Sequence, residues 1–124
     1  MSDFYREKIL DHYNSPRNYG KLEDYTHYAV VENRSCGDKI SLWIKVDENE
    51  TIKNLGFEGE GCVISIAAMS LLGSDIIGKK VCNVLGRTEN DIVDMLGIKL
   101  GPTRKKCAIL SRRAVQKALS GGAT

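Results

Sequence analysis

The pattern of apolar and polar residues divides the chain into a strand-rich first half and a helical second half. Residues 40–46 alternate between apolar and polar side chains, which is typical of a strand with one buried face. A polar turn at residues 47–51 leads to a second such segment at 52–58, and residues 27–31 form a shorter one. These segments predict a small antiparallel sheet of about three strands. Trp43 falls on the polar side of the alternation, so we expect it to face outward.

Apolar residues at helical spacing predict the remaining elements. Residues 2–14 carry an apolar stripe that includes Tyr5, Ile9 and Tyr13, whereas residues 62–77 are apolar on almost every side and predict a buried helix. A shorter helix begins at Thr88, and a last helix runs from about residue 105 to 119. The prediction is an α+β fold in which helices pack on one side of the sheet, with residues 1–124 forming a single domain.

Composition narrows the function classes. The chain has 124 residues, of which 42% are hydrophobic and 27% charged, as in ordinary globular proteins. The longest strongly apolar run, near residues 62–72, is too short to span a bilayer, and the first twenty residues carry no apolar signal core. We therefore expect a cytoplasmic protein without a membrane partner. The formal net charge of +2 gives no reason to expect nucleic acid as a partner.

The cysteines carry the first chemical signal. In a reducing compartment the four cysteines stay free and serve metal or redox chemistry, although none belongs to a Cys-x-x-Cys pair. Cys36, Cys62 and Cys107 lie at predicted element boundaries, next to glycines or to lysine and arginine. We expect the N-termini of helices to lower the pKa of Cys62 and Cys107. Cys82 has neither feature, so we interpret it as a packing residue.

Asp38 lies two residues after Cys36 and completes a candidate metal site. Three soft thiolates bind iron or zinc tightly, and a hard carboxylate as the fourth ligand makes such a site labile. The alternatives are structural: a lone cysteine is most commonly a small buried residue, and a lone aspartate after glycine a solvated turn residue. His12 and His27 are better explained as structural residues than as ligands. The basic run at residues 104–106 is either a solvated helix face or a docking site for an acidic partner.

Four motifs together resemble one known family. They are, in order, residues 11–20 (DHYNSPRNYG), 35–38 (SCGD), 59–65 (GEGCVIS) and 106–110 (KCAIL). Their order and spacing resemble the iron–sulfur cluster assembly scaffolds IscU, SufU and the N-terminal domain of NifU. The resemblance extends over nearly the whole chain and implies a SufE/NifU-like fold.

The resemblance also implies a function and a set of site residues. The family assembles a transient [2Fe–2S] cluster from iron and from sulfur delivered by a cysteine desulfurase (IscS, SufS or NifS type), and then transfers it to apo-proteins. Cys36, Asp38, Cys62 and Cys107 would be the ligands of the metal and the cluster, with Cys107 as persulfide acceptor. Tyr5 matches a family tyrosine implicated in assembly. A frataxin-like protein, an electron donor and a homodimer in the cluster-bound state would belong to the same picture.

Departures from the family pattern leave the branch open. Lys106 replaces the histidine that usually precedes the last cysteine in IscU, as in SufU, yet the insertion usual in SufU is absent. We expect Lys106 to pair with Asp38 when no metal is bound. Residues 100–104 (LGPTR) differ from the IscU motif for an Hsp70-type chaperone, which argues against that partner.

Three functional hypotheses follow. The first is the cluster scaffold, which is not an enzyme. The second is a SufU-like sulfurtransferase, a zinc-dependent sulfur acceptor in which Zn²⁺ is held by the same cysteines and Asp38. The third is a structural zinc or packing domain without transfer chemistry.

Overall fold

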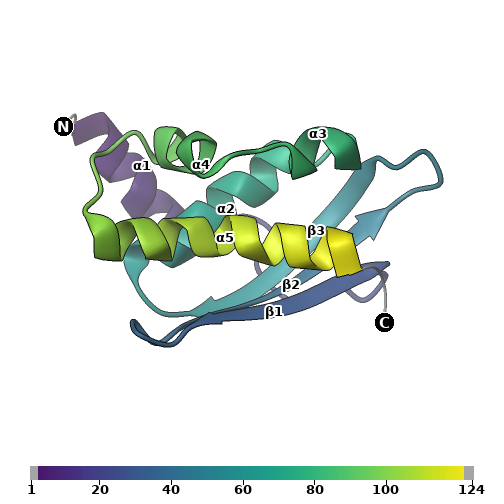
Figure 1. Cartoon of the computed structure of the whole chain (residues 1–124), viewed down its shortest axis with the longest axis horizontal. Helices are drawn as coiled ribbons and strands as arrows, with labels where there is room; N and C mark the ends of the chain where they lie inside the picture. The colour runs from purple at the N-terminus through teal and green to yellow at the C-terminus, as the bar shows by residue number, and fades with distance from the viewer. Residues whose placement is uncertain (1–2, 122–124) are drawn as a thin grey trace.

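The fold is a three-stranded sheet with helices on one face (Figure 1). The computed structural model describes residues 3–121, with the side chains of residues 6–120. Antiparallel strands in the order β1-β2-β3 form the sheet, as the alternating pattern predicted. The elements are α1 (Asp3–Asn14), β1 (His27–Asn33), β2 (Asp38–Val46), β3 (Ile52–Glu60), α2 (Val63–Ile76), α3 (Val81–Leu85), α4 (Glu89–Leu96) and α5 (Pro102–Gly121).

The hydrophobic core lies between the sheet and the helices α2 and α5. Ile40, Leu42 and Ile44 of β2 point into it and are fully buried, together with Phe57 of β3. Helix α2 is buried on nearly all sides because it packs against α1, α4, α5 and β3. The prediction of a buried helix from its uniformly apolar sequence is therefore confirmed.

The outer face of the sheet is less exposed than the alternation predicted. Trp43 is only 6% exposed, because its ring packs against Tyr28 with 5.4 Å between the ring centroids. The loop before β1 also crosses β3: the Gly20 amide donates to the Phe57 carbonyl, and a Cβ on Gly56 would lie 2.4 Å from the Gly20 carbonyl oxygen. Trp43 does lie on the outer face, as the alternation predicted, but the Tyr28 ring covers it, so this face is not freely exposed there.

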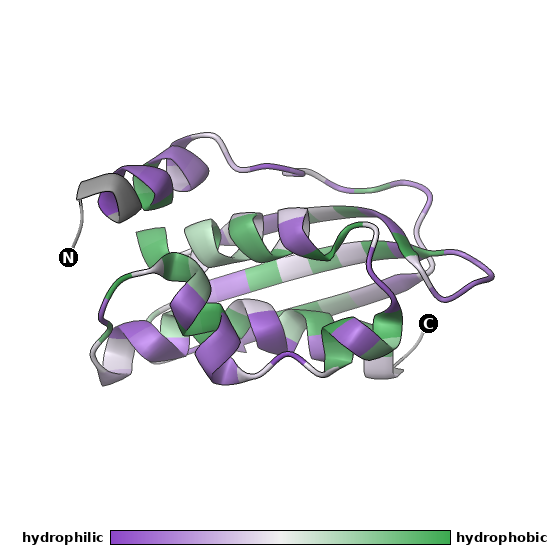
Figure 2. Cartoon of the chain, turned by 90° about the horizontal axis from the view of Figure 1, so that it is seen from above, coloured by the Kyte–Doolittle hydropathy of each residue, from purple (hydrophilic) through white to green (hydrophobic). Residues whose placement is uncertain are grey.

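Helix α1 packs against α2 (Figure 2). Of its predicted stripe, Ile9 is buried and Tyr13 is 38% exposed, while the side chain of Tyr5 lies outside the described residues. A polar contact complements Ile9: the hydroxyl of the buried Ser70 on α2 bonds His12 Nδ1 at 2.7 Å and accepts from the Arg17 amide at 2.8 Å. His12 is thus a structural residue, as is His27, whose Nδ1 bonds Thr26 Oγ1.

The start of α5 and the short helix α3 differ from the prediction, whereas the start of α4 agrees with it. Helix α5 begins at Pro102, three residues before the predicted start, because proline fits the first turn of a helix. Helix α4 begins after Thr88, as predicted, where Thr88 and Asp91 form a capping box, and it ends at Gly97 in the left-handed conformation. The short helix α3 was not predicted, and Cys82 lies exposed on it, so the interpretation of Cys82 as a packing residue was wrong.

None of the helices within residues 3–121 has the length and apolar character needed to cross a membrane.

The Ser70 hydroxyl is expected to hold α1 in place. Changing Ser70→Ala leaves the Arg17 amide and His12 Nδ1 without their partner, so the free energy of unfolding in urea should fall by about 1–3 kcal/mol. Ser111→Ala is the matched control, because the buried Ser111 hydroxyl donates only to Ala108 in its own helix. Equal losses in the two variants would contradict this role for Ser70.

Candidate metal site

The predicted site residues come from three segments that meet at one end of the sheet. Cys36 lies in the turn between β1 and β2, Asp38 begins β2, and Cys62 is the N-cap of α2. Cys107 lies in the second turn of α5. One ligand atom each from Cys36, Asp38 and Cys107 lies within 4.8 Å of the others. Residues far apart in the sequence therefore meet in a space the size of a metal coordination shell.

Asp38 is the most constrained member of this group. Its carboxylate is buried, with the residue only 1% exposed, so the alternative of a solvated turn residue is wrong. Oδ1 accepts a hydrogen bond of 2.9 Å from the Cys62 amide, whereas the buried Oδ2 has no partner among the described residues. An unpaired buried oxygen is costly. A bound cation would satisfy it, so a metal with thiolate and carboxylate ligands fits this site.

Lys106 does not provide the missing partner. Its side chain is exposed, and no ion pair joins it to Asp38 in the described part of the chain. The predicted pairing between Lys106 and Asp38 was wrong, because Lys106 precedes the buried Cys107 on the helix and lies on its solvent side.

Gly61 makes the contact between Asp38 and Cys62 possible. Its φ of +137° is a conformation that favours glycine, and a Cβ there would lie 2.1 Å from Asp38 Oδ1. The sequence showed a glycine beside Cys62 but not what it faces. The close approach of Gly61 to Asp38 could be seen only in the structure, because Asp38 begins β2 and Gly61 lies in the loop between β3 and α2.

Cys107 differs electrostatically from the prediction. Burial raises the pKa of the Cys107 thiol, and the neighbouring Asp38 carboxylate and the Cys62 and Cys36 thiols raise it further. The predicted lowering by the helix N-terminus was wrong for Cys107, since α5 begins five residues earlier and the helix dipole acts mainly on the first turn. Without a bound metal, Cys107 is therefore a thiol near neutral pH.

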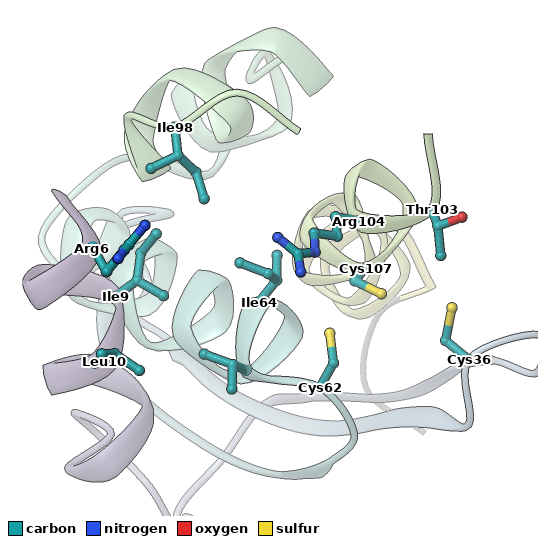
Figure 3. A pocket seen from close by; sticks show the side chains of 11 residues that line it. Arg6, Ile9, Leu10, Cys36, Cys62, Ile64, Ile98, Thr103, Arg104 and Cys107 are labelled. Atoms are coloured by element: carbon teal, nitrogen blue, oxygen red, sulfur yellow. The ribbon is translucent and has the colours of Figure 1, made fainter. Parts of the chain in front are cut away.

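Cys62 and Cys36 are half-buried and face the same space as Cys107 (Figure 3). The Cys62 thiol lies outside the group of three closest ligand atoms and contacts the hydroxyl of the buried Ser65 at 3.6 Å. Ser65 was missed in the sequence, although it lies three residues after Cys62 and thus on the same side of α2. Cys82, on α3, takes no part in the site.

A pocket of about 550 Å³ opens beside the sulfur atoms. Its walls are mainly aliphatic, and Arg6 of α1 and Arg104 of α5 also line it; the remaining lining residues are Ile9, Leu10, Cys36, Cys62, Val63, Ile64, Ile98, Thr103 and Cys107. The site is thus buried at Asp38 and Cys107 but accessible from the side of Cys36 and Cys62.

The sequence as a whole matches a known family. Residues 4–121 match the family described as the NifU-like N terminal domain. The chain belongs to this family. The matched range contains the four motifs of this NifU-like domain, which confirms the resemblance found from them.

Relatives from both branches are similar to this NifU-like domain. It is 39% identical to the iron–sulfur cluster assembly scaffold protein IscU of Thermotoga maritima, over 93% of this chain and 92% of the relative. It is 34% identical to the zinc-dependent sulfurtransferase SufU of Bacillus subtilis, over 97% and 92% of the two chains.

Solved structures share the fold. A putative iron–sulfur cluster assembly scaffold protein for the SUF system from Fervidobacterium islandicum superposes with a TM-score of 0.77 at 29% identity, covering 91% of this chain and 94% of the other. A protein described only as hypothetical gives a TM-score of 0.81 at 28% identity, with coverage of 97% and 99%.

Gly61→Ala is expected to break the contact between Asp38 and the Cys62 amide. The added Cβ displaces the carboxylate, so the free energy of unfolding should fall by about 1–3 kcal/mol more than in Gly37→Ala. Gly37 is the matched control, because it also has a positive φ but a Cβ there meets nothing within 4 Å. Urea unfolding and hydrogen exchange of the Cys62 amide measure the effect. A normal exchange rate of this amide in Gly61→Ala would contradict it.

The four thiols of the metal-free protein should react with iodoacetamide at different rates. The exposed Cys82 should react first and Cys107 last, because Cys107 is buried and the raised pKa of its thiol leaves little thiolate. Peptide mass spectrometry after timed quenching at neutral pH gives the order. Modification of Cys107 ahead of the half-buried Cys36 and Cys62 would show that its environment favours the thiolate instead.

Proposed function

We propose that this protein is a scaffold on which a transient [2Fe–2S] cluster is assembled and from which it is transferred to apo-proteins. The observation that carries the proposal is the convergence of Cys36, Asp38 and Cys107 around a buried, unpaired carboxylate oxygen. The half-buried Cys62 at the same pocket supplies the third sulfur. The similarity to IscU of Thermotoga maritima supports the same function.

In this proposal the cluster is cargo rather than a resident cofactor. Cys36, Cys62 and Cys107 bind it through soft thiolates, and Asp38 supplies a hard oxygen that iron binds less tightly. The open side of the pocket at Cys36 and Cys62 gives an incoming apo-protein access to the cargo. A site with one weak ligand and one open side suits release, whereas a permanent site would be closed.

Sulfur reaches the site through a cysteine desulfurase in this proposal, and Cys107 is the acceptor. The Cys107 thiol gives up its proton and its sulfur attacks the outer sulfur of the donor's persulfide; a new S–S bond forms, the old one breaks, and the donor leaves as a thiolate that takes up the proton. No net oxidation occurs in this exchange. Electrons that reduce the transferred sulfur to sulfide come from a separate electron donor, and a frataxin-like protein completes the proposed set of partners. Free thiols of this kind persist in the reducing cytoplasm, where we place the function.

A second candidate function is a zinc-dependent sulfur acceptor. The similarity to the zinc-dependent sulfurtransferase SufU of Bacillus subtilis favours it, as does Lys106, which resembles the SufU pattern. Zn²⁺ would be a resident ion held by Cys36, Asp38, Cys62 and Cys107, and it would keep the sulfur atoms in the thiolate form.

Anaerobic reconstitution with Fe²⁺, cysteine and a cysteine desulfurase distinguishes these functions. The scaffold should develop a visible chromophore with matched iron and labile sulfide, which Cys36→Ser should abolish. Cys82→Ser is the matched control, because this exposed cysteine lies outside the site, and it should assemble the chromophore normally.

The other outcomes are equally definite. Colourless protein that retains about one zinc and accelerates the desulfurase would overturn the scaffold in favour of the sulfur acceptor. Protein that neither forms a chromophore nor stimulates the desulfurase would have a structural zinc or packing role.

A further inference from the structure

The proposed ligands leave a loaded site with excess negative charge. Three thiolates and one carboxylate carry four negative charges, and a divalent zinc ion or a [2Fe–2S]²⁺ core cancels only two of them. The Cys62 amide is the one hydrogen-bond donor to Asp38 among the described residues. The net charge that remains is unfavourable beside aliphatic walls, unless cations lie nearby.

Two arginines are placed to supply these cations. Arg6 and Arg104 are the charged residues among those that line the pocket, and the lining contains no acidic residue. Arg104 lies three residues before Cys107, so both side chains are on the same side of α5. In Figure 3 the Arg104 guanidinium lies over the pocket between Cys107 and Ile64, while Arg6 approaches from α1.

Neighbouring cations do not share this position. Lys105 and Lys106 follow Arg104 directly but do not line the pocket, and Lys106 is exposed. Arg104 forms no ion pair with a carboxylate in the described part of the chain. The basic run at residues 104–106 is therefore not uniform, because Arg104 alone of its three members lines the pocket.

We propose that Arg104, assisted by Arg6, stabilises the negative charge of the loaded site and so sets how tightly the site holds its metal or cluster. This inference rests on the proposed function, because it takes Cys36, Asp38, Cys62 and Cys107 as the ligands. Arg104 acts through the charge of these ligands without binding the metal. Both arginines are exposed, so their effect is moderate and falls as salt screens the interaction.

Metal affinity of the purified, reduced protein tests this role without any activity assay. Zn²⁺ is titrated in competition with a chromophoric chelator, at low and at high ionic strength. Arg104→Gln should weaken binding about three- to tenfold at low salt, and the loss should shrink at high salt. Arg104→Lys should restore most of the affinity, because it keeps the charge. Arg6→Gln should have a smaller effect in the same direction.

Lys106→Gln is the matched control for Arg104→Gln. Lys106 lies two residues after Arg104, and its side chain does not line the pocket. Lys106→Gln therefore removes the same charge, but its effect on the free energy of Zn²⁺ binding should be less than half as large. Urea unfolding of the metal-free variants checks that each one folds, and Arg104 is exposed, so neither change should disturb the core.

Two results separate failure of this inference from failure of the proposed function. If the wild type binds Zn²⁺ and Cys36→Ser does not, but Arg104→Gln and Lys106→Gln behave alike at low salt, the role of Arg104 is overturned and the site stands. If the wild type binds no more tightly than Cys36→Ser, the proposed ligands are wrong and the inference falls with them. A loss in Arg104→Gln that is independent of salt would also overturn it, because that loss would reflect packing.

Discussion

The site depends on one hydrogen bond, from the Cys62 amide to Asp38 Oδ1. It joins the first residue of β2 to the N-cap of α2, two points that the chain connects only through the whole β2–β3 hairpin. Because Gly61 has no side chain, the two segments can approach closely enough for this bond to form. The bond fixes the turn that carries Cys36 relative to Cys62, and α5 then places Cys107 against both. The buried Asp38 carboxylate thus holds together the three cysteines, which belong to separate elements of the fold.

The fold could be predicted from the sequence because its elements have clear periodicity. The alternation in β2, the uniformly apolar α2 and the capping residues of α4 depend only on residues that are close in the sequence. They can therefore be recognised without knowing the tertiary contacts. Trp43 shows the limit of this reasoning, since its burial depends on Tyr28 from another strand. Helix α3 has too few residues for its periodicity to appear.

The sequence indicated the candidate residues of the site, but not their burial or the pKa of Cys107. Cysteines beside glycine and the motifs of one family made Cys36, Asp38, Cys62 and Cys107 the candidate ligands, and the structure brings three of them together. The sequence did not reveal that Asp38 is buried or that the pKa of the Cys107 thiol is raised, because both depend on which side chains meet in space. For the same reason the sequence could not separate Arg104 from the two lysines that follow it.

The unpaired Oδ2 of Asp38 links occupancy of the site to the lifetime of the chain. A ligand that binds the folded protein and not the unfolded chain raises the free energy of unfolding by mass action. A chain without a bound metal would lack that gain and leave Asp38 Oδ2 unsatisfied at the junction of β2 and α2. Under the proposed function, proteases that act on transiently unfolded chains would therefore remove metal-free molecules faster than loaded ones. One carboxylate oxygen would in this way favour the survival of the molecules that, under the proposed function, carry their cluster.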